Sequence, residues 1–128
     1  MKNKTIINTH SAPKAIGPYS QGVIYHDLIF TSGQIPISLK TNNLVSEKFD
    51  DQVYQVLENI KNLIESQDSS IHNIIKLTVY LTDLSFFDKL NKIFDEFFEG
   101  CELPARSVVE VSKLPKDSKI EIEAIAFK

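Results

Sequence analysis

Apolar residues recur along the chain with two periods, and these periods predict its elements. Short apolar stretches at residues 21–26 and 28–32 are typical of a strand hairpin that turns at His26 and Asp27. From Phe49 to Ile64, apolar residues return every three or four positions, which predicts a first helix. Strict alternation over residues 74–82 predicts a further strand.

The second half of the chain adds a helix and two strands. Residues 86–98 carry five of the eight phenylalanines at helical spacing, and Gly100 marks the expected end of this second helix. Strands are expected at 105–111 and 119–127. The predicted fold is therefore α+β, with two helices packed on one face of a mixed sheet. No linker divides the 128 residues, so a single domain over 1–128 is expected.

Alternation also assigns side chains to the two faces of this expected sheet. The helices should cover the more apolar face, formed by Ile75, Leu77, Val79, Leu81, Val109, Val111, Ile120, Ile122 and Ala124. The opposite face should carry Thr78, Tyr80, Arg106, Val108, Glu110, Glu121 and Glu123. Exposure of Tyr80 and Val108 to water is unfavourable, so this second face is either solvent-exposed despite that cost or covered by another subunit.

Composition and charge exclude several classes of protein. A hydrophobic fraction of 42% and a charged fraction of 24% are typical of a soluble globular protein. A net charge of −3 without a basic patch makes nucleic acid an unlikely partner. The chain shows neither a secretory signal nor an apolar run long enough for a membrane span, so a cytoplasmic protein is expected. Neither metal-ligand spacing nor a phosphate-binding loop is present, so no metal or cofactor is expected.

Arg106 is the single arginine beside 13 lysines, which suggests a position that lysine cannot fill. Its planar guanidinium matches a carboxylate in two parallel hydrogen bonds. Glu121, expected on the same face, could position or polarise a water molecule. The alternative is a cross-strand ion pair between Arg106 and a glutamate, without any chemistry.

Three further residues are candidates, and each has a structural alternative. Tyr19 lies in a proline-rich loop and either offers its hydroxyl to a ligand or packs as an aromatic cap on the sheet. Gly33 either lets the backbone approach a ligand or satisfies turn geometry. Asn91 either reaches a ligand or occupies a solvated helix position.

Three separated blocks carry a resemblance that covers essentially the whole chain. They are Ala12–Gly22 with the sequence APKAIGPYSQG, Ser32–Pro36 with SGQIP, and a C-terminal block made of Pro104–Ser107, Leu114–Asp117 and Ile120–Ala126. In this order the blocks resemble the signatures of the RidA/YjgF family. The resemblance implies a chorismate-mutase-like fold and a homotrimer with three clefts between its subunits.

The resemblance also implies an activity without cofactor or metal. The family's archetype hydrolyses 2-iminobutanoate and 2-iminopropanoate to 2-oxo acids and ammonia, and so protects pyridoxal-phosphate enzymes from these reactive products. A non-catalytic binder of 2-oxo acids is the alternative, because it would need Arg106 but not Glu121. Roles as a ribonuclease, translation inhibitor or stress chaperone have also been proposed for the family, and the acidic charge argues against the ribonuclease.

Carried onto this sequence, the family's functional positions assign roles to the candidates. Arg106 should bind the substrate carboxylate, Tyr19 should line the cleft, and Glu121 should orient the attacking water. Gly33, Ser32 and Asn91 are expected to contact the substrate. Many relatives have a cysteine two places after the arginine, where this chain has Val108. Val108 keeps the backbone carbonyl that the family uses there, but any role of a thiol is lost.

Overall fold

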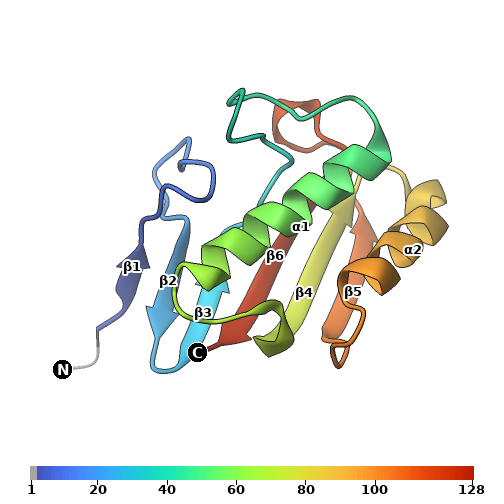
Figure 1. Cartoon of the computed structure of the whole chain (residues 1–128). Coiled ribbons are helices and arrows are strands. Elements are labelled where there is room, and N and C mark those ends of the chain that lie inside the picture. The colour runs from blue at the N-terminus through green and yellow to red at the C-terminus, as the bar shows by residue number, and fades with distance from the viewer. Residues whose placement is uncertain (1–2) are drawn as a thin grey trace.

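A six-stranded sheet and two α-helices make up the fold in the computed structural model, which describes residues 3–128 (Figure 1). The strands are β1 (Thr5–Ile7), β2 (Gly22–Tyr25), β3 (Leu28–Thr31), β4 (Ile74–Leu81), β5 (Ala105–Glu110) and β6 (Ile120–Phe127). The helices are α1 (Phe49–Glu65) and α2 (Phe87–Phe97). Three single turns of 3₁₀-helix lie at Ile71–Asn73, Leu84–Phe86 and Pro115–Asp117.

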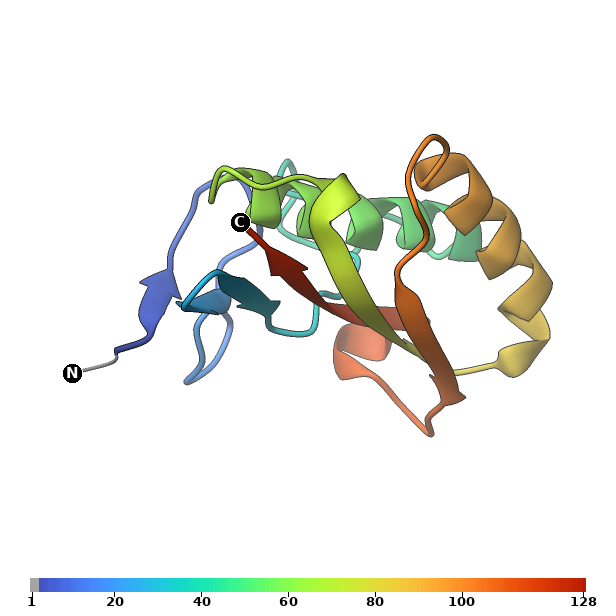
Figure 2. The ribbon, with the colours of Figure 1, turned by 90° about the horizontal axis from the view of Figure 1, so that it is seen from below.

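The sheet has the strand order β1-β2-β3-β6-β4-β5, and only β4 and β5 run parallel to each other. Both helices lie on the same face of the sheet (Figures 1 and 2). The α+β prediction with two helices on one face is therefore confirmed, and each expected element is present within one or two residues of its expected ends. The strand β1 was not expected, because three residues are too few to show a period.

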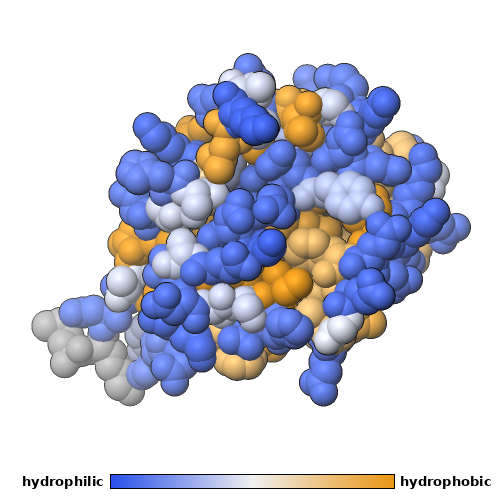
Figure 3. Space-filling view, viewed as in Figure 1, coloured by the Kyte–Doolittle hydropathy of each residue, from blue (hydrophilic) through white to orange (hydrophobic). Residues whose placement is uncertain are grey.

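The helix α1 buries its whole predicted stripe against the sheet. Each of the following residues is at most 4% exposed: Phe49, Val53, Val56, Leu57, Ile60, Leu63 and Ile64. Figure 3 shows the helix side of the molecule, where the surface is mainly hydrophilic and apolar atoms are visible between α1 and α2. No helix within residues 3–128 has both the length and the apolar character that a bilayer crossing requires.

The strand pairing corrects the predicted faces of the sheet. In the β4–β5 ladder, Arg106 lies opposite Leu77 and Val108 lies opposite Val79. Side chains opposite each other in a ladder point to the same face. Arg106, Val108 and Glu110 therefore lie on the helix side, and their prediction for the open face is wrong. Alternation fixes the phase of side chains within one strand, but not the phase between neighbouring strands.

Two apolar residues predicted for the helix side, Val109 and Ile75, are exposed instead. Val109 lies opposite Tyr80 on the edge strand β5, so it faces the open side and is 43% exposed although it is apolar. In β4, a shift of register between Ile74 and Lys76 buries Ile74 and leaves Ile75 43% exposed. The rest of the open face is confirmed: Thr78 lies opposite Glu123, and Tyr80 lies opposite Glu121.

Candidate functional site

The loop that carries Tyr19 is held in place by the buried side chain of Gln21. The Gln21 amide nitrogen donates to the carbonyl oxygens of Thr9, Ala12 and Pro13 at 3.0, 3.2 and 2.9 Å. Its oxygen accepts from the Thr9 backbone N–H at 2.7 Å. One glutamine side chain therefore fixes a proline-rich segment that has no regular structure of its own, which orders the start of the Tyr19 loop.

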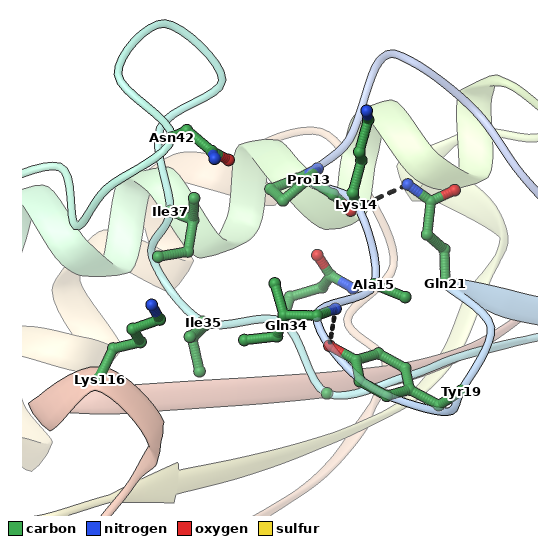
Figure 4. Close-up of a pocket in the computed structure, with 12 residues that line it drawn as sticks. Pro13, Lys14, Ala15, Tyr19, Gln21, Gln34, Ile35, Ile37, Asn42 and Lys116 are labelled. Carbon is green, nitrogen blue, oxygen red and sulfur yellow. Dashed lines mark hydrogen bonds between the residues drawn. The ribbon is translucent and has the colours of Figure 1, made fainter.

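Tyr19 is 48% exposed, and its hydroxyl oxygen accepts a hydrogen bond from the Ile16 N–H at 3.2 Å. The hydroxyl proton remains available to a ligand. Figure 4 shows Tyr19 beside a cavity of about 90 Å³. This cavity is lined by Pro13, Lys14, Ala15, Ile16, Tyr19, Gln21, Gly33, Gln34, Ile35, Ile37, Asn42 and Lys116. Tyr19 is not a packed cap on the sheet, because nearly half of its surface is open.

Gly33 and Glu121 lie in direct contact. The segment after β3 is tied to β6 by two backbone hydrogen bonds between Gln34 and Ile122, at 2.8 and 3.1 Å. This pairing brings the Gly33 backbone against the Glu121 carboxyl group, where a Cβ at Gly33 would lie 2.3 Å from Oε2. The backbone of Gly33 is not left-handed, so turn geometry does not call for glycine, and a larger residue would instead displace the Glu121 carboxyl group.

Glu121 is half-buried on the open face of the sheet. Burial raises the pKa of Glu121, and the neighbouring Glu123 carboxylate raises it further. Tyr80 donates to Glu123 Oε1 at 3.4 Å, while no side-chain hydrogen bond reaches Glu121 within residues 3–128. The carboxylate is therefore a weaker acid than usual and has acceptor positions open to a water molecule or a ligand.

Four predicted site residues converge on one cavity, which we call the glutamate cavity. Its volume is about 330 Å³, and it is lined by Ile16, Tyr19, Ser32, Gly33, Ile35, Pro115 and Glu121. The Ser32 hydroxyl donates to the Ser20 carbonyl oxygen at 2.6 Å, so its oxygen can only accept from a ligand. The structure thus brings together Tyr19, Ser32, Gly33 and Glu121, as the sequence predicts.

Arg106 and Asn91 lie in a different cavity, which we call the arginine cavity. Its volume is about 190 Å³, and it is lined by Asn91, Phe94, Asp95, Phe98, Leu103, Pro104 and Arg106. Burial lowers the pKa of the Arg106 guanidinium, and the charge of Asp95 acts in the opposite direction. An arginine remains protonated at any physiological pH. This cavity therefore presents one fixed positive charge, with one carboxylate nearby on Asp95, in an otherwise mostly apolar lining.

The two cavities do not meet within one chain. Arg106 lies on the helix side of β5, and Glu121 lies on the open side of β6, with β4 between the two strands. Glu121 is therefore excluded as the partner in the cross-strand ion pair between Arg106 and a glutamate that was the alternative. Val108 lines neither cavity and packs partly buried against the core, so its contact with substrate stays a prediction. A ligand that touches both Arg106 and Glu121 needs two copies of the chain.

Several lining residues were missed by the sequence analysis. Ile35 and Pro115 complete the glutamate cavity, and Phe94 and Asp95 complete the arginine cavity. The phenylalanines of α2 were interpreted as core only. Phe87 and Phe94 are seven positions apart and so share one face of the helix. This spacing could have indicated that both rings contact the same group. Across residues 3–128, no group of three or more His, Cys, Asp or Glu side chains is placed to hold a metal ion.

Comparisons with known proteins agree with the family resemblance that the three sequence blocks indicated. The family model described as Endoribonuclease L-PSP matches residues 9–128. A RutC family protein of Pyrococcus horikoshii is 51% identical over 125 residues, which cover 98% of each chain. The protein named "Putative reactive intermediate deaminase TdcF" from Escherichia coli is 45% identical over 127 residues, again 98% of each chain.

Solved structures show the same arrangement. The structure of E. coli TdcF with bound serine superposes with a TM-score of 0.93 at 44% identity, covering 97% of this chain and 98% of that one. The structure of the E. coli YjgF gene product gives a TM-score of 0.93 at 44% identity, with the same shares of the two chains. A family match over nearly the whole chain, together with relatives this similar, shows that the chain belongs to the RidA/YjgF family, whose family model bears the description L-PSP.

Proposed function

We propose that the protein is a deaminase that hydrolyses reactive 2-imino acids, and their enamine tautomers, to 2-oxo acids and ammonia. The expected substrates are 2-iminobutanoate and 2-iminopropanoate, and their removal protects pyridoxal-phosphate enzymes. The proposal is supported mainly by the presence, in one fold, of a group that can bind a carboxylate and a group that can accept a proton. A cation suited to a carboxylate lies in one cavity, and a half-buried carboxyl group with a raised pKa lies against a glycine backbone in the other.

We infer that the complete site forms between copies of the chain in a homotrimer. The arginine cavity of one copy would meet the glutamate cavity of the next. Two different surfaces that join head to tail form a ring when the rotation between copies closes, and a ring of three copies would hold one site at each of its three contacts. Arg106 lies on the edge strand β5, and the open face beside Glu121 carries the exposed Val109 and the half-buried Tyr80. Both features favour an interface in this region.

In the proposed reaction, Arg106 binds the substrate carboxylate through two charge-assisted hydrogen bonds. Glu121 accepts a hydrogen bond from a water molecule and takes its proton as the oxygen attacks the imine carbon. Water addition gives a carbinolamine, and the proton held by Glu121 passes to its nitrogen. The C–N bond then breaks as the C=O bond forms, the hydroxyl proton returns to Glu121 and from there to the released ammonia, and the 2-oxo acid leaves. A protonated imine is already electrophilic, so positioning and the exclusion of bulk water suffice without a covalent nucleophile.

A non-catalytic binder of small carboxylates is the second candidate function. It is favoured by the structure of TdcF, which holds serine. Such a binder would depend on Arg106 and would tolerate a change at Glu121. The two candidate functions therefore differ in the role of Glu121, which takes part in the reaction of a deaminase but only lines the binding site of a binder.

The direct test generates 2-iminobutanoate with a threonine dehydratase and follows the appearance of 2-oxobutanoate. We expect the wild-type protein to accelerate this step. Arg106→Ala should lose about a hundredfold in kcat/KM, since two charge-assisted hydrogen bonds contribute about 3 kcal/mol together. Absence of any acceleration, combined with tight binding of 2-oxobutanoate in calorimetry, would reject the deaminase and support the binder.

A further inference from the structure

The guanidinium of Arg106 is held by aromatic rings and not by an acidic partner. Its central carbon lies 5.2 Å from the centre of the Phe94 ring and 5.5 Å from the centre of the Phe87 ring. Asp95 lines the same cavity, but neither a hydrogen bond nor an ion pair joins it to Arg106 within residues 3–128. Because an acidic partner would occupy the N–H groups of the guanidinium, this arrangement leaves those groups to a ligand.

The two phenylalanines lie on one face of α2, two turns apart, and the Arg106 guanidinium is near both rings. Seven positions on α2 correspond to about 10.5 Å along the helix axis, at 1.5 Å per residue. The guanidinium centre lies between 5 and 6 Å from each ring centre, which is within the range of a cation–π contact to both side chains. A guanidinium stacks through its faces and donates hydrogen bonds through its edge, so rings and a carboxylate do not compete for it.

We propose that Phe87 and Phe94 are positioning residues, which orient the Arg106 guanidinium so that its N–H edge is presented to the substrate carboxylate. The proposal rests on the proposed function only for the role of Arg106 as the carboxylate ligand. Phe94 is 6% exposed and belongs to the core, whereas Phe87 is 39% exposed. One ring is thus anchored by packing, and the other is partly open to solvent.

An apolar side chain without a ring at position 87 or 94 would fill the space of the phenylalanine but lose its cation–π contact with Arg106. A leucine packs well but has neither a flat face nor the negative ring face that attracts a cation. Arg106 would then sample more rotamers, and binding a carboxylate would cost more conformational entropy. The ring at each position therefore contributes to ligand affinity through the arginine, in addition to any packing.

Phe87→Leu is the main test variant, because Phe87 is partly exposed and the protein should fold without its ring. Phe94→Leu is the second variant, and Phe94→Tyr retains a ring. Phe86→Leu is the matched control, since Phe86 is next to Phe87 in sequence but stacks on Phe49 at 4.3 Å and lies under Lys89. Only the first two of these substitutions should act on Arg106.

The first readout needs no ligand. Arg106 is the single arginine, so the protein gives one arginine Nε–Hε signal in a nitrogen-15 NMR spectrum. Ring currents should displace this signal in the wild-type protein, and Phe87→Leu and Phe94→Leu should move it toward the position of a free arginine. Phe86→Leu and Phe94→Tyr should leave it nearly unchanged. A signal that is unaffected by both leucine variants would overturn the proposal.

The second readout is affinity for 2-oxobutanoate, with steady-state kinetics on the imine beside it. Phe87→Leu should weaken binding about threefold to tenfold, the range expected for one cation–π contact. It should raise KM while kcat is retained, because the carboxylate is bound equally in the ground and transition states. In an Arg106→Lys background, the same substitution should have a smaller effect, and an equal effect in both backgrounds would contradict action through the arginine.

The NMR and affinity readouts separate the deaminase activity from the positioning role of Phe87. A protein that binds 2-oxobutanoate but does not hydrolyse imines would reject the deaminase, while the NMR signal and the affinity would still decide the role of Phe87. Imine hydrolysis with unchanged KM and an unchanged arginine signal in Phe87→Leu would keep the deaminase and reject the positioning role.

Discussion

At the scale of single residues, Gly33 and Glu121 depend on each other for their positions. A methyl group at position 33 would lie 2.3 Å from Glu121 Oε2 and 2.8 Å from its Cδ, so the carboxyl group must move. Gly33→Ala should therefore lower kcat by at least about tenfold, because a displacement of about 1 Å in a positioned group commonly costs more than that. Stability should change little, since a side-chain end can rotate away. Kinetics combined with urea unfolding checks both expectations, and an unchanged kcat would show that the Glu121 position is not used.

Glu121 itself should separate binding from chemistry. Glu121→Gln keeps the shape of the side chain and removes its capacity to take a proton, so turnover should fall about a hundredfold or more while 2-oxobutanoate still binds. The matched control is Glu123→Gln, which changes the neighbouring carboxyl group that accepts from Tyr80. An equal loss of binding and turnover in Glu121→Gln would instead indicate a structural role.

The raised pKa of Glu121 also gives a dependence of stability on pH. Because the folded-state pKa lies above the ordinary value of 4.5, the folded chain holds the proton more firmly, and stability falls as pH rises from 4.5 through the folded-state pKa. Glu121→Gln should therefore increase stability at pH 7 and have little effect near pH 4. The comparison is made in an Arg106→Ala background, where no guanidinium from a neighbouring copy offsets the charge. A Gln variant that is less stable at pH 7 than at pH 4, relative to its parent, would contradict the expected sign.

The sequence identified most residues of the glutamate cavity, but it placed the arginine on the wrong face. Tyr19, Gly33 and Glu121 were recognised from residue type and family blocks, and they converge as expected. Arg106 was placed from alternation, which cannot report the phase between β5 and its neighbour. Phe87 and Phe94 were hidden among core phenylalanines, because hydrophobicity does not distinguish a ring that packs from a ring that also binds a cation.

At the scale of elements, α1 holds the loops that line the site through two buried polar side chains. The Asn59 amide nitrogen donates to the carbonyl oxygens of Ile35 and Ile37 at 3.3 and 3.1 Å. Gln52 accepts from the Lys119 N–H at 2.8 Å, just before β6 begins. The segments on both sides of the glutamate cavity are therefore fixed to the same helix.

Asn59→Ala should destabilise the protein by about 2 kcal/mol, because it removes the donor to the Ile37 carbonyl oxygen and one of the two donors to the Ile35 carbonyl oxygen. Activity should fall as well, since Ile35 lines the glutamate cavity. The control is Gln55→Ala, which removes only a donor to the Asn59 side chain and should cost less. Urea unfolding measures both, and equal stabilities of the two variants would show that Asn59 does not anchor the loop.

The long helices and strands were predictable from the spacing of apolar residues, but the pairing of the strands in the sheet was not. The apolar stripe of α1 and the alternation of β4 matched the structure because packing against a single core imposes the period. The shift of register in β4 and the short strand β1 left no periodic signal. Pairing between strands depends on contacts distant in sequence, so a single strand cannot reveal it.

At the scale of the whole molecule, the fold separates two cavities that the proposed reaction needs together. One copy offers a carboxylate-binding cation at its edge strand, and the same copy offers a carboxyl group on the other side of the sheet. Light scattering should therefore report a particle of three times the 14.5 kDa chain mass. A stable monomer with full activity would contradict the shared site.

Subunit mixing tests the shared site most directly. Arg106→Ala and Glu121→Gln chains should each be nearly inactive alone on 2-iminobutanoate. When equal amounts are unfolded, mixed and refolded together, about one quarter of the contacts should pair an intact Arg106 with an intact Glu121 from the next copy. We expect the mixture to recover about one quarter of wild-type activity, and activity no greater than that of the separate variants would contradict a site shared between copies.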